Sequence, residues 1–313
     1  MGENKQMKGT AEYVPASDSK AGNSDLITRA YHDSLLLEFR HMGNELPDTR
    51  TRLLGRDLPS PVMAGSLTLF EKMNPQGTAG FARAVKEAGT IMWAGWMEDD
   101  TFRTAADTGV MAVRGIKPFE DDDRIFKAIE TAKECGAVAI SMDIDHCFGD
   151  SGKDCEFVLG KLSHKTMDQL AAYARAAAPL PFIFKGILSP VDAVKCLQIH
   201  AAGCGISHHK GIWSYSVPPL LVLPKIKEAS EGRLELIADC GLRDGIDAFK
   251  ALARGADGVC VARPLMAAYS KGGPEAVTDY LKHMAEELAG TMAKTGAADI
   301  AGIDPEVLYT RTW

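Results

Sequence analysis

Polar side chains with catalytic chemistry follow four short apolar runs in the second half of the chain. They are Lys185, then His208 and His209, then Asp239 and Arg243, and finally Arg263. Each apolar run is typical of a buried strand, and the carboxyl ends of parallel strands meet at one edge. A lysine, an imidazole, an aspartate and two arginines at that edge can hold a phosphorylated, redox-active ring beside a base. The pattern points to a flavin enzyme.

The loops after the last two runs are predicted to bind phosphate. Gly241 and Arg243 follow the first of these runs, and Arg263 follows the second. Glycine lets backbone N–H groups approach an anion, and arginine supplies a forked donor. Asp239, just before the glycine, is placed to bind sugar-like hydroxyls. The alternative is that these arginines form a salt-bridge network at the surface. The presence of an arginine after both runs favours phosphate binding.

Lys185 and one histidine are the candidates for the reaction itself. An unpaired lysine is costly to bury at a barrel mouth, so Lys185 indicates either a Schiff base or a cation that stabilises a reduced flavin. We expect His209 to face the mouth as a general base. Its neighbour His208 is expected to point away and to be structural.

Eight apolar runs alternate with amphipathic segments. The runs span residues 61–65, 90–95, 109–116, 137–144, 181–187, 203–207, 235–239 and 258–262. Helical spacing occurs at residues 78–88, 122–135, 166–178, 189–200, 217–230 and 245–254. Continuous apolar runs are typical of strands buried on both faces. Eight such units predict a (β/α)8 TIM barrel, and their even spacing disfavours the alternative, a doubly wound sheet.

The flanking segments are predicted to lie outside the barrel. Helical patterns at residues 27–39 and 274–295 indicate an N-terminal helical extension and a C-terminal helix, and residues 43–60 are polar turn material. Residues 1–25 are rich in Lys, Gly, Ser, Asn and Asp, and we expect them to be disordered. Residues 26–313 would then form a single domain.

Composition limits the partners. The net charge of −7 argues against nucleic acid or an anionic membrane as the main partner. No run approaches the ~18 apolar residues of a membrane span, and no secretory pattern is present, so we expect a cytoplasmic protein. The seven cysteines are scattered and fit reduced, buried thiols. A zinc site from Cys147, Cys155, His146 and His164 matches no standard spacing, and no metal is expected.

Longer motifs extend over residues 50–298. They are Pro61-Val-Met-Ala-Gly, Ala88-Gly-Thr-Ile-Met, Phe184-Lys-Gly-Ile, Ala201-Ala-Gly-Cys-Gly-Ile-Ser-His-His and the run from Asp239 to Pro264. In these motifs the chain resembles the FMN-dependent α-hydroxy-acid oxidases and dehydrogenases, such as glycolate oxidase and lactate oxidase. The run from Asp239 to Pro264 is highly specific. The resemblance implies that residues 26–313 form one FMN-binding barrel domain.

The resemblance also implies residue roles. FMN contacts fall on Gly65, Ser66, Gly95, Asp143, Lys185, Ser207, Asp239, Gly241, Arg243, Ala262 and Arg263. Lys185 would stabilise the reduced ring and Asp239 would bind the ribityl chain. His209 falls on the family's catalytic histidine, and Asp145 on the carboxylate that orients it.

Several positions depart from the family pattern. Ile212 replaces an arginine that binds the substrate carboxylate, and Lys117 replaces a tyrosine that binds the substrate. Asp143 replaces a threonine. Gly115 replaces a glutamine that contacts the flavin, and the second substrate arginine falls near Gly152.

Two explanations of these departures stay open. In the first, the ammonium group of Lys117, together with that of Lys210 or Lys153, binds the substrate carboxylate in place of the missing arginine. Alternatively, the substrate is not a plain α-hydroxy carboxylate, and Trp93, Trp96 and Ile212 shape a less polar pocket. We therefore predict substrate contacts at Lys117, His209, Lys210 and Ile212, and catalytic roles for His209, Asp145, Lys185 and Lys117.

The sequence thus predicts an FMN-dependent oxidoreductase that oxidises a small α-hydroxy acid or related alcohol, with His209 as general base. The alternatives are a non-redox, isomerase-like barrel enzyme that binds FMN or a phosphate, and a catalytically silent FMN-binding subunit. By resemblance the protein would be a homotetramer. The sequence does not identify the electron acceptor.

Overall fold

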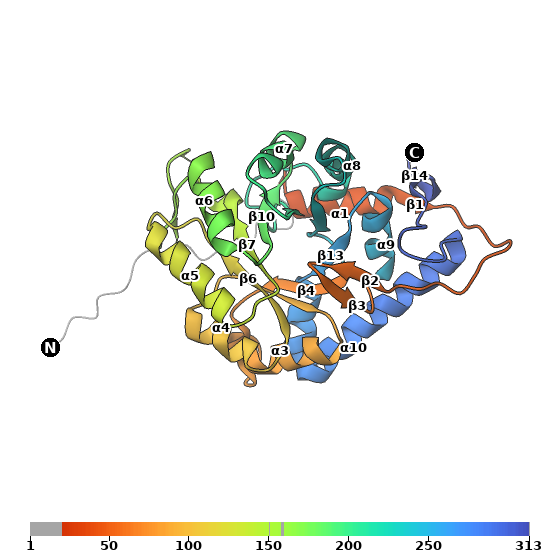
Figure 1. Ribbon diagram of the computed structural model, residues 1–313. Coiled ribbons are helices and arrows are strands. Elements are labelled where there is room, and N and C mark those ends of the chain that lie inside the picture. Colours follow the sequence, from red (N-terminus) through yellow and green to blue (C-terminus); the bar gives the residue numbers. More distant parts are fainter. Residues whose placement is uncertain (1–20, 150, 158–159, 313) are drawn as a thin grey trace.

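Eight parallel strands form a closed barrel, as the sequence predicts (Figure 1). The computed structural model describes residues 21–149, 151–157 and 160–312. The barrel strands, in spatial order, are β4 (Val62–Leu67), β5 (Ile91–Ala94), β6 (Met111–Ile116), β7 (Ala139–Asp143), β10 (Phe182–Ile187), β11 (Gly203–Ile206), β12 (Glu235–Ala238) and β13 (Gly258–Val261). Pairing of β13 with β4 closes the barrel.

A plug of apolar side chains fills the inside of the barrel near its amino end. Met63, Trp93, Ile183 and Ile237 project inward from four different strands and pack together. The antiparallel hairpin of β2 (Thr51–Leu53) and β3 (Arg56–Leu58) adds Leu53, Leu54 and Leu58 to this cluster. The sequence predicted only turn material at residues 43–60, because two three-residue strands are too short to give a periodic signal.

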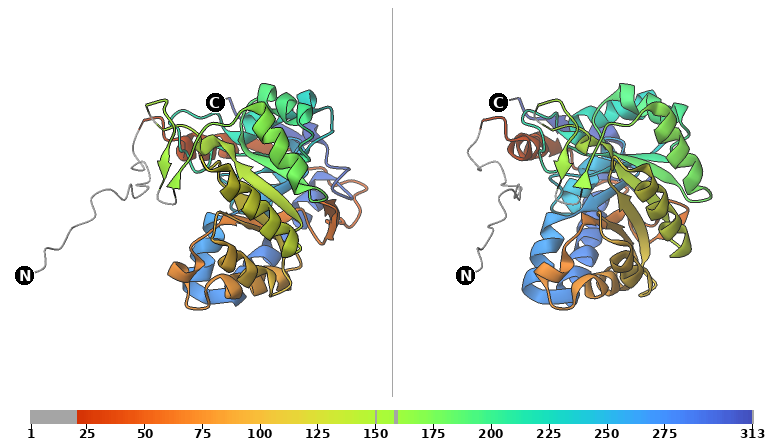
Figure 2. Two further views of the ribbon diagram at one scale, coloured as in Figure 1. Left: turned by 60° about the vertical axis from the view of Figure 1, so that its left-hand side comes forward. Right: turned by 90° about the vertical axis from the view of Figure 1, so that its left-hand side faces the viewer.

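Helices surround the barrel (Figures 1 and 2). They are α2 (Phe70–Met73), α3 (Gly77–Glu87), α4 (Asp99–Ala106), α5 (Asp122–Glu134), α6 (Met167–Ala177), α7 (Pro190–Gln198), α8 (Pro219–Ser230), α9 (Gly245–Ala253) and α10 (Arg263–Thr295). The sequence analysis missed α4, which buries only Phe102 and Ala105. Among the described residues, no helix combines the length and apolar character needed to cross a membrane.

Helix α10 begins eleven residues before the predicted start at 274. It starts at Arg263, and Gly273 interrupts it with non-helical angles (φ 68°, ψ −157°) immediately before Pro274. The Gly272-Gly273-Pro274 sequence therefore marks a kink inside a helix, although it has the composition of a helix boundary. The extra segment places Arg263 at the first turn of a helix that starts at the barrel rim.

The N-terminal helix also differs from the prediction. Helix α1 spans Ser24–Ser34, because the Asn23 side chain accepts hydrogen bonds from the backbone N–H groups of Asp25 and Leu26. It ends early because β1 (Leu35–Leu37) pairs with β14 (Leu308–Thr310), a tertiary contact that local sequence does not reveal. The predicted boundary at residue 25 therefore lies inside α1, whereas residues 1–20 of the predicted disordered segment lie outside the described residues. In Figure 1, α1 lies beside α8 and α9.

Three short elements complete the described chain. They are the 3-10 helix η1 (Ile144–His146) after β7, the hairpin of β8 (Glu156–Phe157) and β9 (Gly160–Lys161), and the 3-10 helix η2 (Pro305–Val307). The first of them carries two side chains to the carboxyl end of the barrel.

Candidate active site

The barrel register brings Lys185 and Asp143 to the same level on neighbouring strands. They are paired in the β10–β7 ladder, and Gly205 is the partner of Lys185 on β11. A Cβ atom at Gly205 would lie 2.8 Å from Lys185 Cγ, so glycine leaves room for the lysine side chain. Lys185 therefore extends inside the barrel mouth instead of away from it.

Two carboxylates and a hydroxyl surround the Lys185 ammonium group. Its Nζ atom lies 3.2 Å from Asp239 Oδ2 and 3.8 Å from Asp143 Oδ1, and it donates to Ser207 Oγ at 3.2 Å. Burial lowers the pKa of Lys185, but Asp239 and Asp143 outweigh this and raise it. Lys185 is therefore a permanent cation, which fits a role in stabilising negative charge and disfavours a Schiff-base nucleophile.

His209 follows β11 in a left-handed conformation (φ 48°), and its backbone N–H donates to Ser207 Oγ. Its Nδ1 atom lies 3.4 Å from Asp145 Oδ2 and 3.7 Å from Asp143 Oδ1. Lys185 Nζ lies 3.4 Å from the same Nδ1 atom, but the two carboxylates outweigh this single ammonium group. They favour the tautomer with hydrogen on Nδ1, which leaves the Nε2 lone pair as a base. Gly186 makes room for Asp145, because a Cβ atom there would lie 2.5 Å from Asp145 Cγ.

The charges around His209 keep its imidazole neutral. Burial lowers the pKa of His209 to about 4, and Lys185 and Lys117 act in the same direction, whereas Asp145 and Asp143 oppose it. The basic form thus persists well below the ordinary histidine pKa of 6.5. His209 is ready to accept a proton at neutral pH.

This shift predicts the pH dependence of substrate oxidation. Because the free enzyme protonates His209 only near pH 4, kcat/KM for flavin reduction should stay constant from about pH 8 to about pH 5.5 and fall at lower pH. Anaerobic stopped-flow rates across this range would test the expectation. An acid limb centred near pH 6.5 would contradict it.

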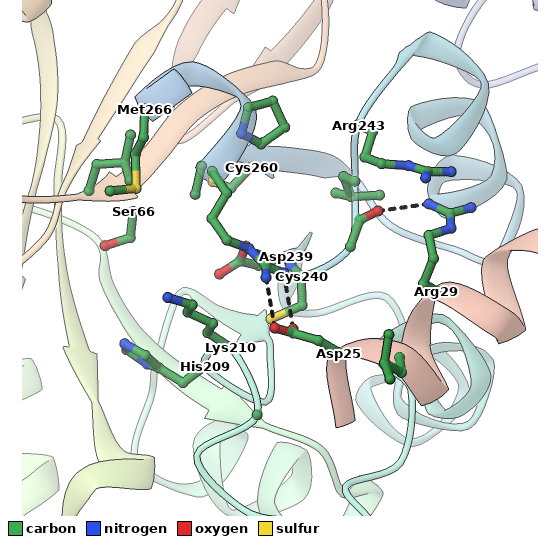
Figure 3. Close-up of a pocket in the computed structure, with 18 of the residues that line it drawn as sticks. Asp25, Arg29, Ser66, His209, Lys210, Asp239, Cys240, Arg243, Cys260 and Met266 are labelled. Carbon is green, nitrogen blue, oxygen red and sulfur yellow. Dashed lines mark hydrogen bonds and ion pairs between the residues drawn. The ribbon is translucent and has the colours of Figure 1, made fainter. Parts of the chain in front are cut away.

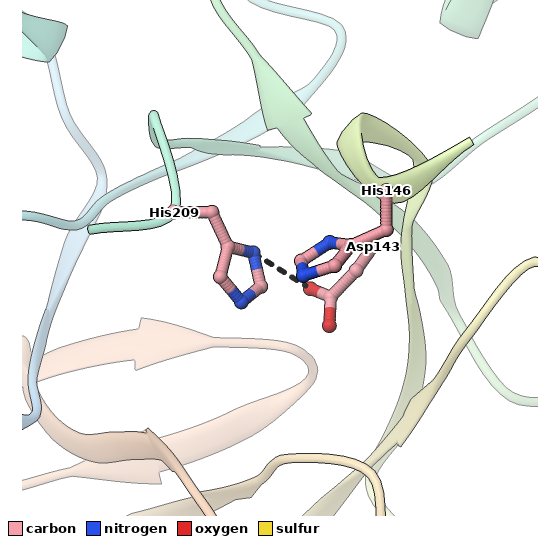
Figure 4. A group of neighbouring side chains, drawn as sticks. All are labelled: Asp143, His146 and His209. Carbon is pink, nitrogen blue, oxygen red and sulfur yellow. Dashed lines mark ion pairs between the residues drawn. The ribbon is translucent and has the colours of Figure 1, made fainter. Parts of the chain in front are cut away.

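His146 and Lys117 form a second polar group beside His209. The rings of His146 and His209 meet edge to face, with centroids 4.1 Å apart (Figure 4). Lys117 Nζ lies 2.8 Å from Asp143 Oδ2 and 3.1 Å from His146 Nε2. Lys117 Nζ also lies 3.3 Å from His146 Nδ1, and this Nδ1 atom lies 3.0 Å from Asp145 Oδ1. A carboxylate only accepts, so Asp145 favours a hydrogen on His146 Nδ1. Asp145 thereby orients two imidazoles.

The sequence singled out His146 only as an unlikely zinc ligand. Its position next to Asp145 was the available signal for a site role. Oxygen and nitrogen atoms of Asp143, His146 and His209 do lie within 4.8 Å of one another. However, the Lys117 ammonium group already lies against Asp143 and His146, where a metal ion would bind. Burial raises the pKa of Cys147 to about 12, so this thiol is a poor zinc ligand as well.

A cavity of about 670 Å³ extends from His209 across the barrel mouth (Figure 3). Nine of the predicted site residues line it: Ser66, Lys185, His209, Lys210, Asp239, Gly241, Arg243, Ala262 and Arg263. In Figure 3, His209 and Ser66 lie at one end and Arg243 at the other. The volume suits a cofactor-sized ligand. Arginines at one end and a buried lysine near the other fit the phosphate and the ring of FMN.

Helix α1 contributes residues to the arginine end of the cavity, which sequence reasoning missed. Asp25 makes a two-pronged ion pair with Arg263, at 2.7 and 3.0 Å from Nη1 and Nη2. Arg29 donates to the carbonyl oxygen of Gly241 at 2.9 Å and to Asp247 at 2.7 Å. The available signal was the Asn-Ser-Asp sequence at 23–25, which is typical of a helix start.

The other predicted site residues do not line the cavity. Lys117, Asp143, Asp145 and Ser207 contact the lining residues Lys185 and His209 or one another, whereas Gly65, Gly95 and Ile212 lie outside the lining. Their site roles stay predictions.

Trp93 does not shape the pocket that the sequence suggested, whereas a pocket role for Trp96 stays a prediction. Trp93 packs inside the barrel and donates to Ser141 Oγ, and Trp96 packs against Phe119. Both are buried side chains that do not line the cavity. In a strand buried on both faces, sequence alone does not tell which face a side chain occupies, and β5 directs Trp93 into the amino-end plug.

His208 has the structural role that we expected. It is buried, its Nε2 atom lies 2.8 Å from Thr28 Oγ1 of α1, and its Nδ1 atom accepts from the backbone of Gly211. Burial lowers the pKa of His208, so the ring is neutral. It ties the loop that carries His209 to α1.

The fold and the cavity together define a (β/α)8 barrel whose mouth fits a phosphorylated flavin next to a neutral histidine. The sequence model of the FMN-dependent dehydrogenase family matches residues 5–156 and 149–310. The chain therefore belongs to the FMN-dependent dehydrogenase family, whose cofactor is FMN.

Known relatives match most of the chain at low identity. A 2-hydroxyacid oxidase of Dictyostelium discoideum is 28% identical over 92% of this chain and 84% of its own length. An L-lactate oxidase of Lacticaseibacillus rhamnosus is 28% identical, with coverages of 95% and 88%. A solved structure of a mandelate oxidase variant with an FMN adduct superposes with a TM-score of 0.84, at 25% identity, over 94% of this chain and 93% of that one. The protein is a divergent member of the family.

Proposed function

We propose that this protein oxidises the carbinol carbon of a small 2-hydroxy acid or related alcohol and transfers the electrons to FMN. The observation that carries this proposal is the neutral His209 at one end of the cavity, 3.4 Å from Asp145 and 3.4 Å from the Lys185 ammonium group. A base, its orienting carboxylate and a cation for the reduced cofactor are the parts this reaction needs. The activities of the related oxidases support it.

The chain's own residues would divide the work as follows. Arg243 and Arg263 with the backbone of Gly241 would hold the FMN phosphate, and Asp239 would accept hydrogen bonds from the ribityl hydroxyls. Bound FMN supplies the two-electron acceptor. The Lys185 ammonium group would offset the negative charge gained on reduction.

His209 would perform the proton transfer. Its Nε2 atom would take the proton of the substrate hydroxyl, and Asp145 would hold the ring in the productive tautomer and stabilise the resulting imidazolium. The buried mouth would strengthen these interactions by excluding water. Lys210, which lines the cavity, and Lys117, which is buried against Asp143 and His146 beside His209, are the candidates for polar contacts to the substrate. Lys153 is exposed in the loop after β7.

The test is an anaerobic titration of the purified protein. We expect the visible flavin bands near ~450 nm, and we expect them to bleach when one of a panel of L- and D-2-hydroxy acids and related alcohols is added. Flavin that no donor reduces would leave a silent FMN-binding subunit. A protein that binds no FMN after reconstitution would overturn the proposal.

We further propose that the protein is a cytoplasmic homotetramer. The seven free cysteines support the reducing compartment. The exposed apolar side chains of Phe39, Met42 and Leu46, between β1 and β2, support an interface between subunits.

A further inference from the structure

The formal charges of the side chains around His209, at one end of the cavity, sum to zero. Three lysines and three aspartates lie there: Lys117, Lys185, Lys210, Asp143, Asp145 and Asp239. Three positive and three negative charges cancel, and His209 adds none at neutral pH. Proton transfer to His209 adds one positive charge, which matches the negative charge gained by the reduced cofactor. The site is thus neutral before and after an uncharged substrate reacts.

A substrate carboxylate would disturb this balance. Of the arginines that line the cavity, Arg29 and Arg243 lie at the end away from His209 (Figure 3), and Arg263 is paired with Asp25. Ile212 offers no charge. By resemblance, Lys117 stands where a tyrosine binds the substrate, and Asp143 Oδ2 lies 2.8 Å from its Nζ atom. Both side chains are buried, with 7% and 5% of their surfaces exposed, so solvent screens them little. A carboxylate approaching Lys117 would meet the opposing charge of Asp143.

The pairing also explains two departures from the family together. By resemblance, a tyrosine and a threonine have been replaced by Lys117 and Asp143, and these replacements form an ion pair with each other. The exchange adds polar hydrogen-bonding groups without adding net charge. Lys117 is then not a replacement for the missing arginine, because its charge is already neutralised.

We propose that Asp143 acts through Lys117 to set substrate specificity, so that the enzyme oxidises uncharged 2-hydroxy carbonyl compounds, such as 2-hydroxy amides, at least as efficiently as the corresponding 2-hydroxy carboxylates. The inference rests on the proposed function. An amide carbonyl oxygen accepts a hydrogen bond from Lys117 without adding charge. In the reaction the carbinol C–H and O–H bonds break and a C=O bond forms. The hydroxyl proton goes to His209, and two electrons with the remaining hydrogen go to oxidised FMN.

The test compares matched pairs of substrates, lactamide with lactate and mandelamide with mandelate, in anaerobic flavin reduction by the FMN-loaded enzyme. In the wild type, we expect kcat/KM for each amide to equal or exceed that for its acid. Asp143→Asn removes the negative charge that lies 2.8 Å from the Lys117 ammonium group, so the acid-to-amide ratio should rise by about tenfold or more. A wild type that prefers the acids, or a ratio that Asp143→Asn leaves unchanged, would overturn the inference.

Asp145→Asn is the matched control. Asp145 contacts the two imidazoles and not Lys117, so this variant should slow both members of each pair and raise the acid-to-amide ratio less than Asp143→Asn does. If Asp143→Asn does not fold, the wild-type ratio still decides. The affinities of the 2-oxo amide and 2-oxo acid products, from their perturbation of the flavin spectrum, give a second measure. Flavin that neither amides nor acids reduce would overturn the proposed function itself, whereas faster reduction by acids would overturn this inference alone.

Discussion

Replacing His209 with glutamine is expected to slow flavin reduction by about 10³-fold while the protein keeps its FMN. General base catalysis contributes roughly 10²–10⁴-fold, and glutamine cannot accept the hydroxyl proton. Glutamine can still contact Asp145, so the loop after β11 should keep its conformation. The measurement is the anaerobic rate of flavin bleaching by saturating donor, together with the FMN content of the purified variant.

His208→Gln is the matched control, because it changes the neighbouring imidazole. His208 contacts Thr28 of α1 and the backbone of Gly211, and its own side chain does not line the cavity. Losing one buried hydrogen bond should cost about 1 kcal/mol of unfolding free energy and change the rate of flavin bleaching only a few-fold. A His209→Gln rate within tenfold of the wild type, or an equal loss in both variants, would show that His209 is not the base.

The barrel and the arginine end of the cavity, which is expected to bind the FMN phosphate, were predictable because they depend on local sequence patterns. A continuous apolar run followed by a polar residue identifies both a buried strand and its carboxyl end, as at Lys185 and Asp239. The barrel then brings these ends together without further information. Nine of the predicted residues do line one cavity. The specific motif between Asp239 and Pro264 identified the ligand that such an arrangement holds.

The parts that the sequence did not reveal depend on contacts between distant segments. Asp25 pairs with Arg263, which is 238 positions away, and β1 pairs with the C-terminal β14. The polar composition before residue 25 masked the start of α1. His146 was overlooked because the residue next to a catalytic aspartate has no fixed orientation until η1 turns its ring toward His209. Similarly, Lys117 and Asp143 looked like separate departures until their strands placed them 2.8 Å apart.

Replacing Lys185 with methionine is expected to have the second large effect, on both stability and cofactor. Lys185 is buried between Asp239 and Asp143, and methionine would leave both carboxylates without this cation. Removing one partner of a buried ion pair costs about 3–5 kcal/mol. We therefore expect a lower free energy of unfolding and a weaker affinity for FMN, measured by denaturant titration and by quenching of flavin fluorescence.

A second substitution separates the two effects. Lys185→Met combined with Asp239→Asn removes one of the two buried carboxylates that Lys185→Met leaves without a cation. The double variant should therefore recover much of the unfolding free energy, while the reduced flavin stays poorly stabilised. Lys195→Met is the matched control, because Lys195 forms an exposed ion pair with Asp192 on α7 and should contribute less than about 1 kcal/mol. If Lys185 stabilises the reduced cofactor, the reduction potential of bound FMN will fall in both Lys185 variants and stay at the wild-type value in Lys195→Met. The loss of a purely structural ion pair would affect oxidised and reduced flavin equally. An unchanged reduction potential in a folded, FMN-loaded Lys185→Met variant would therefore show that this lysine has only a structural role.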